Sequence, residues 1–115
     1  NPIVVHGNSD PVEIRQLIPY TQILKINNLN IGIIHPAWGK EEFDYKELFN
    51  DFPSKKLDAI FFGHTHEPVN EVINNTLFVN PGQAYSSFLV PATIAIITIN
   101  NQNIYCEIRE ISPAL

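Results

Sequence analysis

The chain has 115 residues, of which 44% are hydrophobic and 17% charged, so it can bury one core and we expect residues 1–115 to form a single domain. Its net charge of −5 argues against a non-specific nucleic-acid binder. No apolar stretch is long enough to span a membrane, so we expect no membrane partner and a cytoplasmic protein, with a leader sequence on a longer parent chain left open.

The first half of the chain is expected to alternate strands with helices. A short β-branched strand over residues 3–6 ends in the polar segment Gly7–Asp10. Asp10 is expected to N-cap a helix that has Pro11 in its first turn and runs to about residue 17. Strands over residues 20–26 and 30–34 follow, joined by a tight turn at 27–29. A second helix is predicted over 41–52, ended by Pro53.

The second half is expected to be rich in strands, over residues 57–62, 69–73, 76–80, 93–99 and 104–110. Two hairpins are predicted, across Asn74–Asn75 and across 100–103. The segment 83–91 between them is irregular. Helices early and hairpins late predict an α/β fold, a mixed-sheet sandwich. The single cysteine, Cys106, excludes an intrachain disulfide, and we interpret it as a buried structural thiol.

The most informative segment is Gly63–His66, where two histidines stand one residue apart as an apolar run ends. Histidine is the commonest protein ligand for transition metals. His64 and His66 could present ring nitrogens to one metal or to two neighbouring metals. Taken alone, a chance His-x-His with both rings in solvent is an equal alternative.

Polar groups also follow two other predicted strands. Asn8 and Asp10 follow the first, and His35 follows the strand over 30–34. Ligands of open α/β sheets bind beyond the carboxyl ends of the strands. Imidazole nitrogens mixed with amide and carboxylate oxygens suit a borderline divalent ion. Together with His64 and His66, these residues therefore predict a metal site.

Four blocks of the chain resemble the calcineurin-like metallophosphoesterases, and within them the small phosphodiesterases of the YfcE type. The blocks occur in the family's order, at Gly7–Asp10, Ile33–His35, Gly63–His66 and Asn80–Gly82. The resemblance implies two divalent metal ions bridged by an aspartate and a water, with Mn²⁺ expected and Zn²⁺, Fe²⁺, Ni²⁺ and Mg²⁺ as alternatives. For the complete protein, it also implies hydrolysis of small-molecule phosphodiesters by a hydroxide held between the ions, and the activity of this chain alone stays open.

The same resemblance implies roles for single residues. Asn8, His35 and His64 match ligands of one metal, and His66 matches a ligand of the other. Asp10 matches a carboxylate that supports its loop, and we count it with His64 as a candidate catalytic residue. The natural substrate stays open, as does the oligomeric state, for which a homo-oligomer is one option.

The chain departs from the family pattern at three places. Ser9 stands where many members have a histidine that acts as general acid, and a serine hydroxyl is a poor proton donor near neutral pH. Pro36 follows His35 where glycine is usual. The family's N-terminal Asp-x-His and Gly-Asp motifs, which supply the bridging aspartate, are absent. We therefore expect the C-terminal portion of a longer protein, lacking its N-terminal strands.

Two other functional hypotheses remain beside the enzyme. The fold also resembles the retromer subunit Vps29, a protein-binding scaffold. Alternatively, the chain is a catalytically inactive fragment, because lost strands would expose unpaired backbone and apolar surface.

Several other residues have both a structural and a functional interpretation. Trp38 is expected either to wall the pocket or to pack on the next helix. For Tyr85 and Phe88, core packing is favoured over covering the site or making a dimer contact. His6 is interpreted as a side chain held within the fold. No cluster of Arg or Lys is expected at the strand ends to bind a phosphate.

Overall fold

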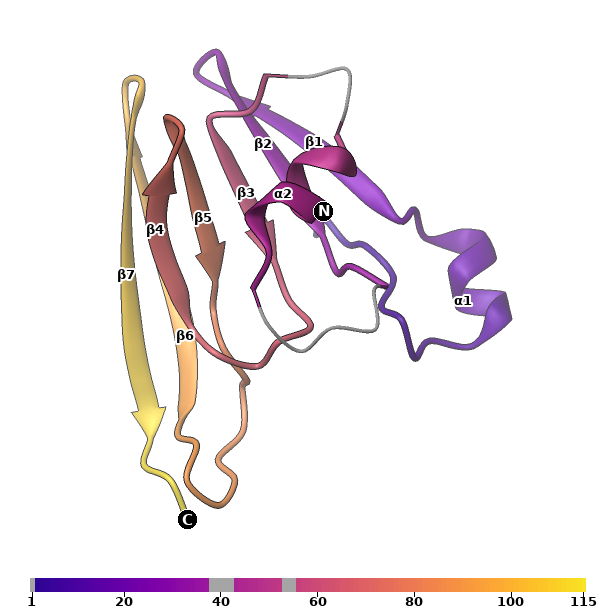
Figure 1. Cartoon of the computed structure of the whole chain (residues 1–115), viewed down its shortest axis with the longest axis vertical. Coiled ribbons are helices and arrows are strands. Elements are labelled where there is room, and N and C mark those ends of the chain that lie inside the picture. Colours follow the sequence, from indigo (N-terminus) through magenta and orange to yellow (C-terminus); the bar gives the residue numbers. More distant parts are fainter. Residues whose placement is uncertain (1, 38–42, 53–55) are drawn as a thin grey trace.

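The computed structural model describes residues 2–37, 43–52 and 56–115 and contains two sheets (Figure 1). One sheet has five strands in the order β1-β2-β3-β5-β4, and the other is the hairpin β6-β7. The strands are β1 (Thr21–Ile26), β2 (Leu29–Ile34), β3 (Ala59–Phe62), β4 (Val69–Ile73), β5 (Thr76–Asn80), β6 (Ala92–Asn100) and β7 (Asn103–Ser112). This arrangement confirms the predicted mixed α/β sandwich.

Two short helices, α1 (Val12–Leu17) and α2 (Tyr45–Asn50), accompany the sheets. Within the described ranges, no helix is both long and apolar enough to cross a membrane. The start predicted for the second helix, at residue 41, and its predicted stop at Pro53 lie outside the described residues. In the part that is described, α2 begins after Asp44, whose carboxylate accepts from the backbone N–H of Lys46 and Glu47.

The three central strands, β2, β3 and β5, run parallel, whereas β1 and β4 pair antiparallel to their neighbours at the two edges. Parallel strands point the same way, so their carboxyl ends meet at one edge of the sheet. Ile34, Phe62 and Asn80 are the last residues of these strands. The segments that follow them therefore converge on one region, which is where the metal site was predicted.

One face of the five-stranded sheet packs against α2 and the residues beside it. Phe78 of β5 is fully buried there. Its ring centroid lies 5.5 Å from that of Phe43 and 5.3 Å from that of Phe49. Leu48 of α2 and Phe52, just after it, are buried in the same apolar cluster. The spacing of these side chains thus fixes α2 on the sheet by burying a shared aromatic cluster.

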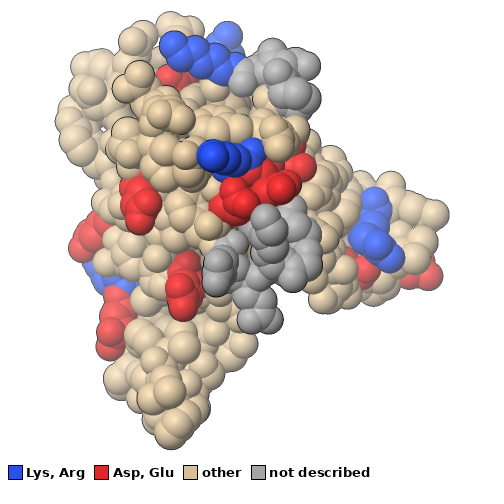
Figure 2. Space-filling model, in the orientation of Figure 1, with Lys and Arg blue, Asp and Glu red and all other residues tan. Residues whose placement is uncertain are grey.

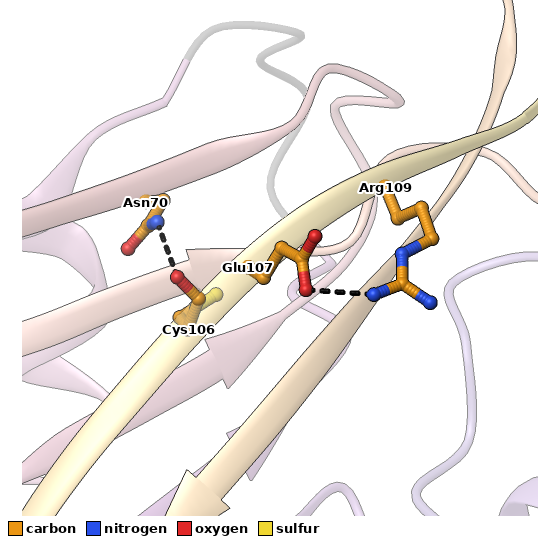
Figure 3. Close-up of polar contacts among 4 residues, drawn as sticks. All are labelled: Asn70, Cys106, Glu107 and Arg109. Carbon is orange, nitrogen blue, oxygen red and sulfur yellow. Dashed lines mark hydrogen bonds and ion pairs between the residues drawn. The ribbon is translucent and has the colours of Figure 1, made fainter.

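The hairpin β6-β7 covers the opposite face. Side chains of Ile97 and Cys106 pack there against a buried cluster that includes Ile31 of β2. The Asn70 side-chain amide of β4 donates to the Cys106 carbonyl at 3.0 Å, which links the two sheets (Figure 3). Cys106 is half-buried rather than fully buried as predicted, and this burial raises the pKa of its thiol.

Left-handed asparagines close the hairpin turns. Asn27 and Asn28 have φ of 50° and 67°, and Asn74 and Asn75 have φ of 52° and 65°. Two consecutive residues with positive φ match the twist of the flanking strands, and asparagine tolerates this conformation. The turn between β6 and β7 has one such residue, Asn101, at φ 56°. The predicted hairpins are therefore confirmed, with bounds within one or two residues of those expected.

Three structural predictions were wrong. The first concerns residues 3–6, which form no strand. They run alongside the turn into β1, where the His6 N–H donates to Pro19 and the Gln22 side chain donates to the Val4 carbonyl. These two bonds do not make a β-ladder. β-branched residues form a strand only where a partner strand pairs with them.

The second error is the N-cap of α1. Pro11 occupies that position, and no side chain caps the helix. The Asp10 carboxylate instead accepts from the backbone N–H of Gly7 at 2.6 Å. An aspartate can bond the backbone on either side of itself, and here the tight turn before it competes successfully with the helix after it.

The third error is the packing of Tyr85 and Phe88, whose side chains are 59% and 78% exposed. Their segment turns at Leu89, which has φ of 73°, and is closed by hydrogen bonds between the backbones of Ser87 and Val90. This tight local turn points the apolar side chains away from both sheets.

Candidate metal centre

An open cleft of about 870 Å³ lies at the carboxyl ends of β2 and β3. It brings together all of the predicted site residues, which come from three separate segments of the chain. Its lining consists of Gly7, Asn8, Ser9, Asp10, Arg15, His35, Ala37, His64, Thr65 and His66. The fold therefore supports the prediction that the strand ends converge, although residues 2–7 reach the cleft as an irregular segment.

Three potential metal ligands meet at one point in this cleft. The Asn8 side-chain oxygen lies 2.8 Å from Nε2 of His35 and 3.3 Å from Nδ1 of His64. The two imidazole rings are edge to face, with centroids 5.6 Å apart. One amide oxygen and two ring nitrogens thus approach each other from segments that lie 27 and 56 residues apart in sequence.

Gly63 makes room for the His35 ring. A Cβ atom on Gly63 would lie 2.9 Å from Nδ1 of His35, closer than real side chains pack. A Cβ atom on Gly7 would meet the same ring at 3.5 Å, which is ordinary contact. Gly63 therefore allows the backbone after β3 to pass directly beside the ring, and the ring is held between that backbone and the loop that carries Asn8.

The loop that carries Asn8 is stabilised by Asp10. Besides the bond from the Gly7 N–H to the Asp10 carboxylate, the backbone N–H of Asp10 donates to the Gly7 carbonyl at 3.3 Å. These two bonds close a turn around Asn8 and Ser9. A charged acceptor strengthens the first bond, so Asp10 fixes the loop rather than pointing a free carboxylate at the histidines.

Both histidines of the His-x-His segment have left-handed backbones, with φ of 88° at His64 and 66° at His66. This conformation costs a non-glycine residue about 1–2 kcal/mol. Between them, the Thr65 hydroxyl oxygen accepts from the side-chain amide of Asn80 at 2.9 Å. Tertiary contacts therefore maintain a loop shape that the local sequence alone would disfavour.

Burial lowers the pKa of His35 below its ordinary value of 6.5, and the neighbouring rings of His64, His66 and His6 lower it further. The Asp10 carboxylate acts in the opposite direction and does not reverse the shift. A lowered pKa keeps the imidazole neutral near pH 7, which is the form that binds metal ions.

Within residues 2–37, 43–52 and 56–115, no group of three His, Cys, Asp or Glu side chains is placed to hold a metal ion. The donors that do converge are Asn8, His35 and His64, and one of them is an amide. Nitrogen and neutral oxygen ligands suit divalent ions of intermediate hardness. The described residues therefore fit part of a divalent-metal site.

Arg15 of α1 also lines the cleft, and sequence reasoning missed it. Figure 2 shows basic atoms over α1, whose one basic residue is Arg15. Among the described residues, none forms a hydrogen bond or ion pair with its guanidinium. The sequence shows a cation five residues after Asp10, but its place in the cleft depends on the path of α1, which the sequence alone does not reveal. Trp38, predicted to wall the pocket or pack on a helix, lies outside the described residues.

Comparison with known proteins assigns the family. The model of the calcineurin-like phosphoesterase superfamily domain matches residues 2–102. The chain belongs to this family. Membership implies divalent metal ions as cofactors, in agreement with the donor set at the strand ends.

Two relatives show how far the similarity extends. A probable metallophosphoesterase of Methanocaldococcus jannaschii is 31% identical over 80 residues, which are 70% of this chain and 40% of the relative. The solution structure of a Thermotoga maritima protein is 29% identical, with a TM-score of 0.67, and the match covers 93% of this chain and 64% of that one. The chain thus spans less than two thirds of the length of either relative.

The fold is also similar to that of Vps29 from Entamoeba histolytica, solved in complex with Zn²⁺. The identity is 24% and the TM-score 0.67, and the match covers 92% of this chain and 67% of Vps29. At this level of identity, the similarity concerns the fold alone.

Proposed function

We propose that this chain carries the cleft of a metal-dependent phosphodiesterase that hydrolyses small-molecule phosphodiesters. The observation that supports the proposal most strongly is the meeting of the Asn8 oxygen with ring nitrogens of His35 and His64, at 2.8 and 3.3 Å. The family supports phosphoester chemistry in general. The choice of phosphodiesters rests on the resemblance to the YfcE-type enzymes.

In this proposal, Asn8, His35 and His64 hold one metal ion and His66 contributes to a second, with Mn²⁺ as the first candidate. Bound divalent ions would supply Lewis-acid activation of the phosphoryl group and of the attacking water. His64 would act within reach of the reacting atoms, as its proposed catalytic role requires. Asp10 would be a positioning residue, because its carboxylate fixes the turn that presents Asn8.

The remaining groups of the cleft complement an anionic substrate. The Arg15 guanidinium has five N–H donors and a permanent charge, which suits phosphate oxygens. Ser9 lines the cleft where many relatives have a histidine, and its hydroxyl would give little general acid catalysis. Substrates with good leaving groups are therefore favoured.

Metal stoichiometry after exposure to manganese, by elemental analysis, tests the ligand assignment. We expect the unmodified chain to retain Mn²⁺ and His64→Ala to lose nearly all of it, together with hydrolysis of bis(p-nitrophenyl) phosphate. His6→Ala is the matched control, because this ring packs beside Tyr20, with centroids 5.5 Å apart. Equal Mn²⁺ content in His64→Ala and the unmodified chain would refute the assignment. Two ions per chain would mean that further residues complete the site.

A protein-binding scaffold is the second candidate function. It is favoured by the exposed side chains of Tyr85, Phe88 and Leu89, which lie together in one irregular segment. Exposed aromatic and aliphatic groups on a rigid turn are typical of interaction sites. If the chain neither binds Mn²⁺ nor hydrolyses phosphodiesters, the scaffold and an inactive fragment are the two hypotheses left, and binding of a partner protein that is lost in Phe88→Ala would support the scaffold.

A further inference from the structure

The side chain of Asn80, at the end of β5, is 1% exposed and has a fixed orientation. Its oxygen accepts from the backbone N–H of Gly82 at 2.9 Å. A backbone N–H can only donate, so this oxygen must face Gly82, and the amide nitrogen must face Thr65. The hydrogen-bond network thus assigns both ends of the amide.

This orientation determines what the Thr65 hydroxyl can do. The Asn80 amide nitrogen, 2.9 Å away, only donates, so the Thr65 oxygen must accept. The hydroxyl proton is then left to donate to a different acceptor. No such acceptor lies within hydrogen-bond distance among the described residues. Thr65 lines the cleft, so its hydroxyl is a donor available at the cleft wall.

The turn that holds Asn80 cannot easily rotate. The Thr93 hydroxyl of β6 donates to the Pro81 carbonyl at 2.7 Å, and the Thr93 N–H donates to the Gln83 carbonyl at 2.9 Å. Gly82 has φ of 82°, and a Cβ atom there would clash with the Thr93 hydroxyl oxygen. Thr93 of the second sheet therefore holds the turn after Asn80 in place, and with it the orientation of the Asn80 amide beside the cleft.

We propose that the Thr65 hydroxyl donates a hydrogen bond to an oxygen of a phosphate-type anion in the cleft, with Asn80 as the positioning residue that sets this polarity. The identity of the anion rests on the proposed function, whereas the polarity of the hydroxyl rests on the two bonds of Asn80. Arg15 lines the same cleft and supplies the positive charge that such an anion requires. The Thr65 donor adds direction, since it can bond only an oxygen placed on its side of the cleft.

Affinity for inorganic phosphate, measured by calorimetric titration without metal and with Mg²⁺, tests this proposal. Thr65→Val keeps the shape and removes the donor, so we expect phosphate affinity to fall roughly tenfold or more, as for a lost hydrogen bond to a charged group. Thr65→Ser retains a hydroxyl and is expected to bind within about twofold of the unmodified chain. Thr98→Val is the matched control, because Thr98 is an exposed residue of β6 outside the cleft. It should leave the affinity unchanged.

Asn80→Asp tests the polarity itself. The new carboxylate can only accept, so it would capture the Thr65 proton and phosphate affinity should fall although the Thr65 hydroxyl is still present. Because a buried charge can unfold the chain, the stability of Asn80→Asp is checked by chemical denaturation. If Asn80→Asp is unfolded, the phosphate affinity of Thr65→Val alone tests the proposal. Phosphate affinity that is equal in Thr65→Val and the unmodified chain would overturn the proposal, as would an unmodified chain that binds no phosphate.

A parallel Mn²⁺ titration separates this proposal from the metal site. If the chain binds Mn²⁺ and its phosphate affinity is the same in Thr65→Val, only the proposed role of the Thr65 hydroxyl as a donor is overturned. Phosphate binding that depends on Thr65 without any Mn²⁺ binding would overturn the metal assignment and leave the donor in place.

Discussion

The two ends of the five-stranded sheet both contain left-handed residues, but for different reasons. At the hairpin end, Asn74 and Asn75 adopt φ of 52° and 65° in a turn that favours asparagine. At the cleft end, His64 and His66 adopt φ of 88° and 66° with no such local preference. The left-handed conformation of the asparagines follows from their own turn preference, whereas that of the histidines is imposed by packing around a site. Left-handed strain that packing imposes on the cleft end therefore indicates a place where function constrains this chain.

The largest expected effect concerns the turn that supports the cleft. Gly82→Ala combines a left-handed alanine with a Cβ atom that clashes with the Thr93 hydroxyl oxygen, so we expect the free energy of unfolding to fall by roughly 3 kcal/mol. Urea denaturation measures this change. Gly7→Ala is the control, since its Cβ atom would have neighbours no closer than 3.5 Å. Equal losses in both variants would show that the turn at Gly82 is not under special constraint.

A smaller effect is expected when left-handed residues at the cleft end and at the hairpin end of the sheet are each replaced by glycine. His66→Gly removes the left-handed penalty of an exposed side chain, so we expect the free energy of unfolding to rise by about 0.5 kcal/mol, after the extra chain entropy of glycine is counted. Asn75→Gly relieves little strain, and its stability should stay level or fall slightly. Chemical denaturation of the metal-free variants measures both. If the two substitutions change stability alike, the distinction between the two ends is wrong.

The smallest effect is a pH dependence that involves only the cleft end. The pKa of His35 is lowered in the folded state, so the unfolded chain takes up a proton first as the pH falls through about 6.5. The free energy of unfolding should therefore rise with pH between the folded and unfolded pKa values, and this contribution is lost on acidification. Denaturation at pH 5 and pH 7.5, with a chelator present, measures it. His35→Gln should flatten the dependence; identical slopes in His35→Gln and the unmodified chain would exclude His35 as the cause.

Most of the fold could be predicted from the sequence because its signals are local. The Asn-Asn turns, the short strands β4 and β5 on either side of one of them, and the aromatic face of α2 each depend on neighbours within a few residues. Residues 3–6 could not be predicted as irregular, because the same β-branched run becomes a strand when a partner is present. The capping role of Asp10 failed for a similar reason: two local bonds compete, and tertiary structure selects one.

The sequence indicated which candidate residues would meet in the cleft, but not the contacts that hold them there. His35, His64 and Asn8 were identified from the positions at which apolar runs end. Their supports were not, because Asn80 touches Thr65 across 15 residues and Arg15 reaches the cleft only through the path of α1. Family resemblance pointed to the loop that holds Asn80 without indicating that its amide orients a hydroxyl.

The connectivity of the two sheets has a consequence for the order in which the chain folds. Strands β6 and β7 are joined by a short turn that pairs Asn100 with Asn103, so their contacts are close in sequence. The central ladder instead pairs Ile31 with Ala59 across a long crossover. Short loops close faster than long ones, and a hairpin forms within microseconds. We therefore expect the C-terminal hairpin to form early. Formation of the parallel ladder, with the cleft at its edge, is expected to limit the rate of folding.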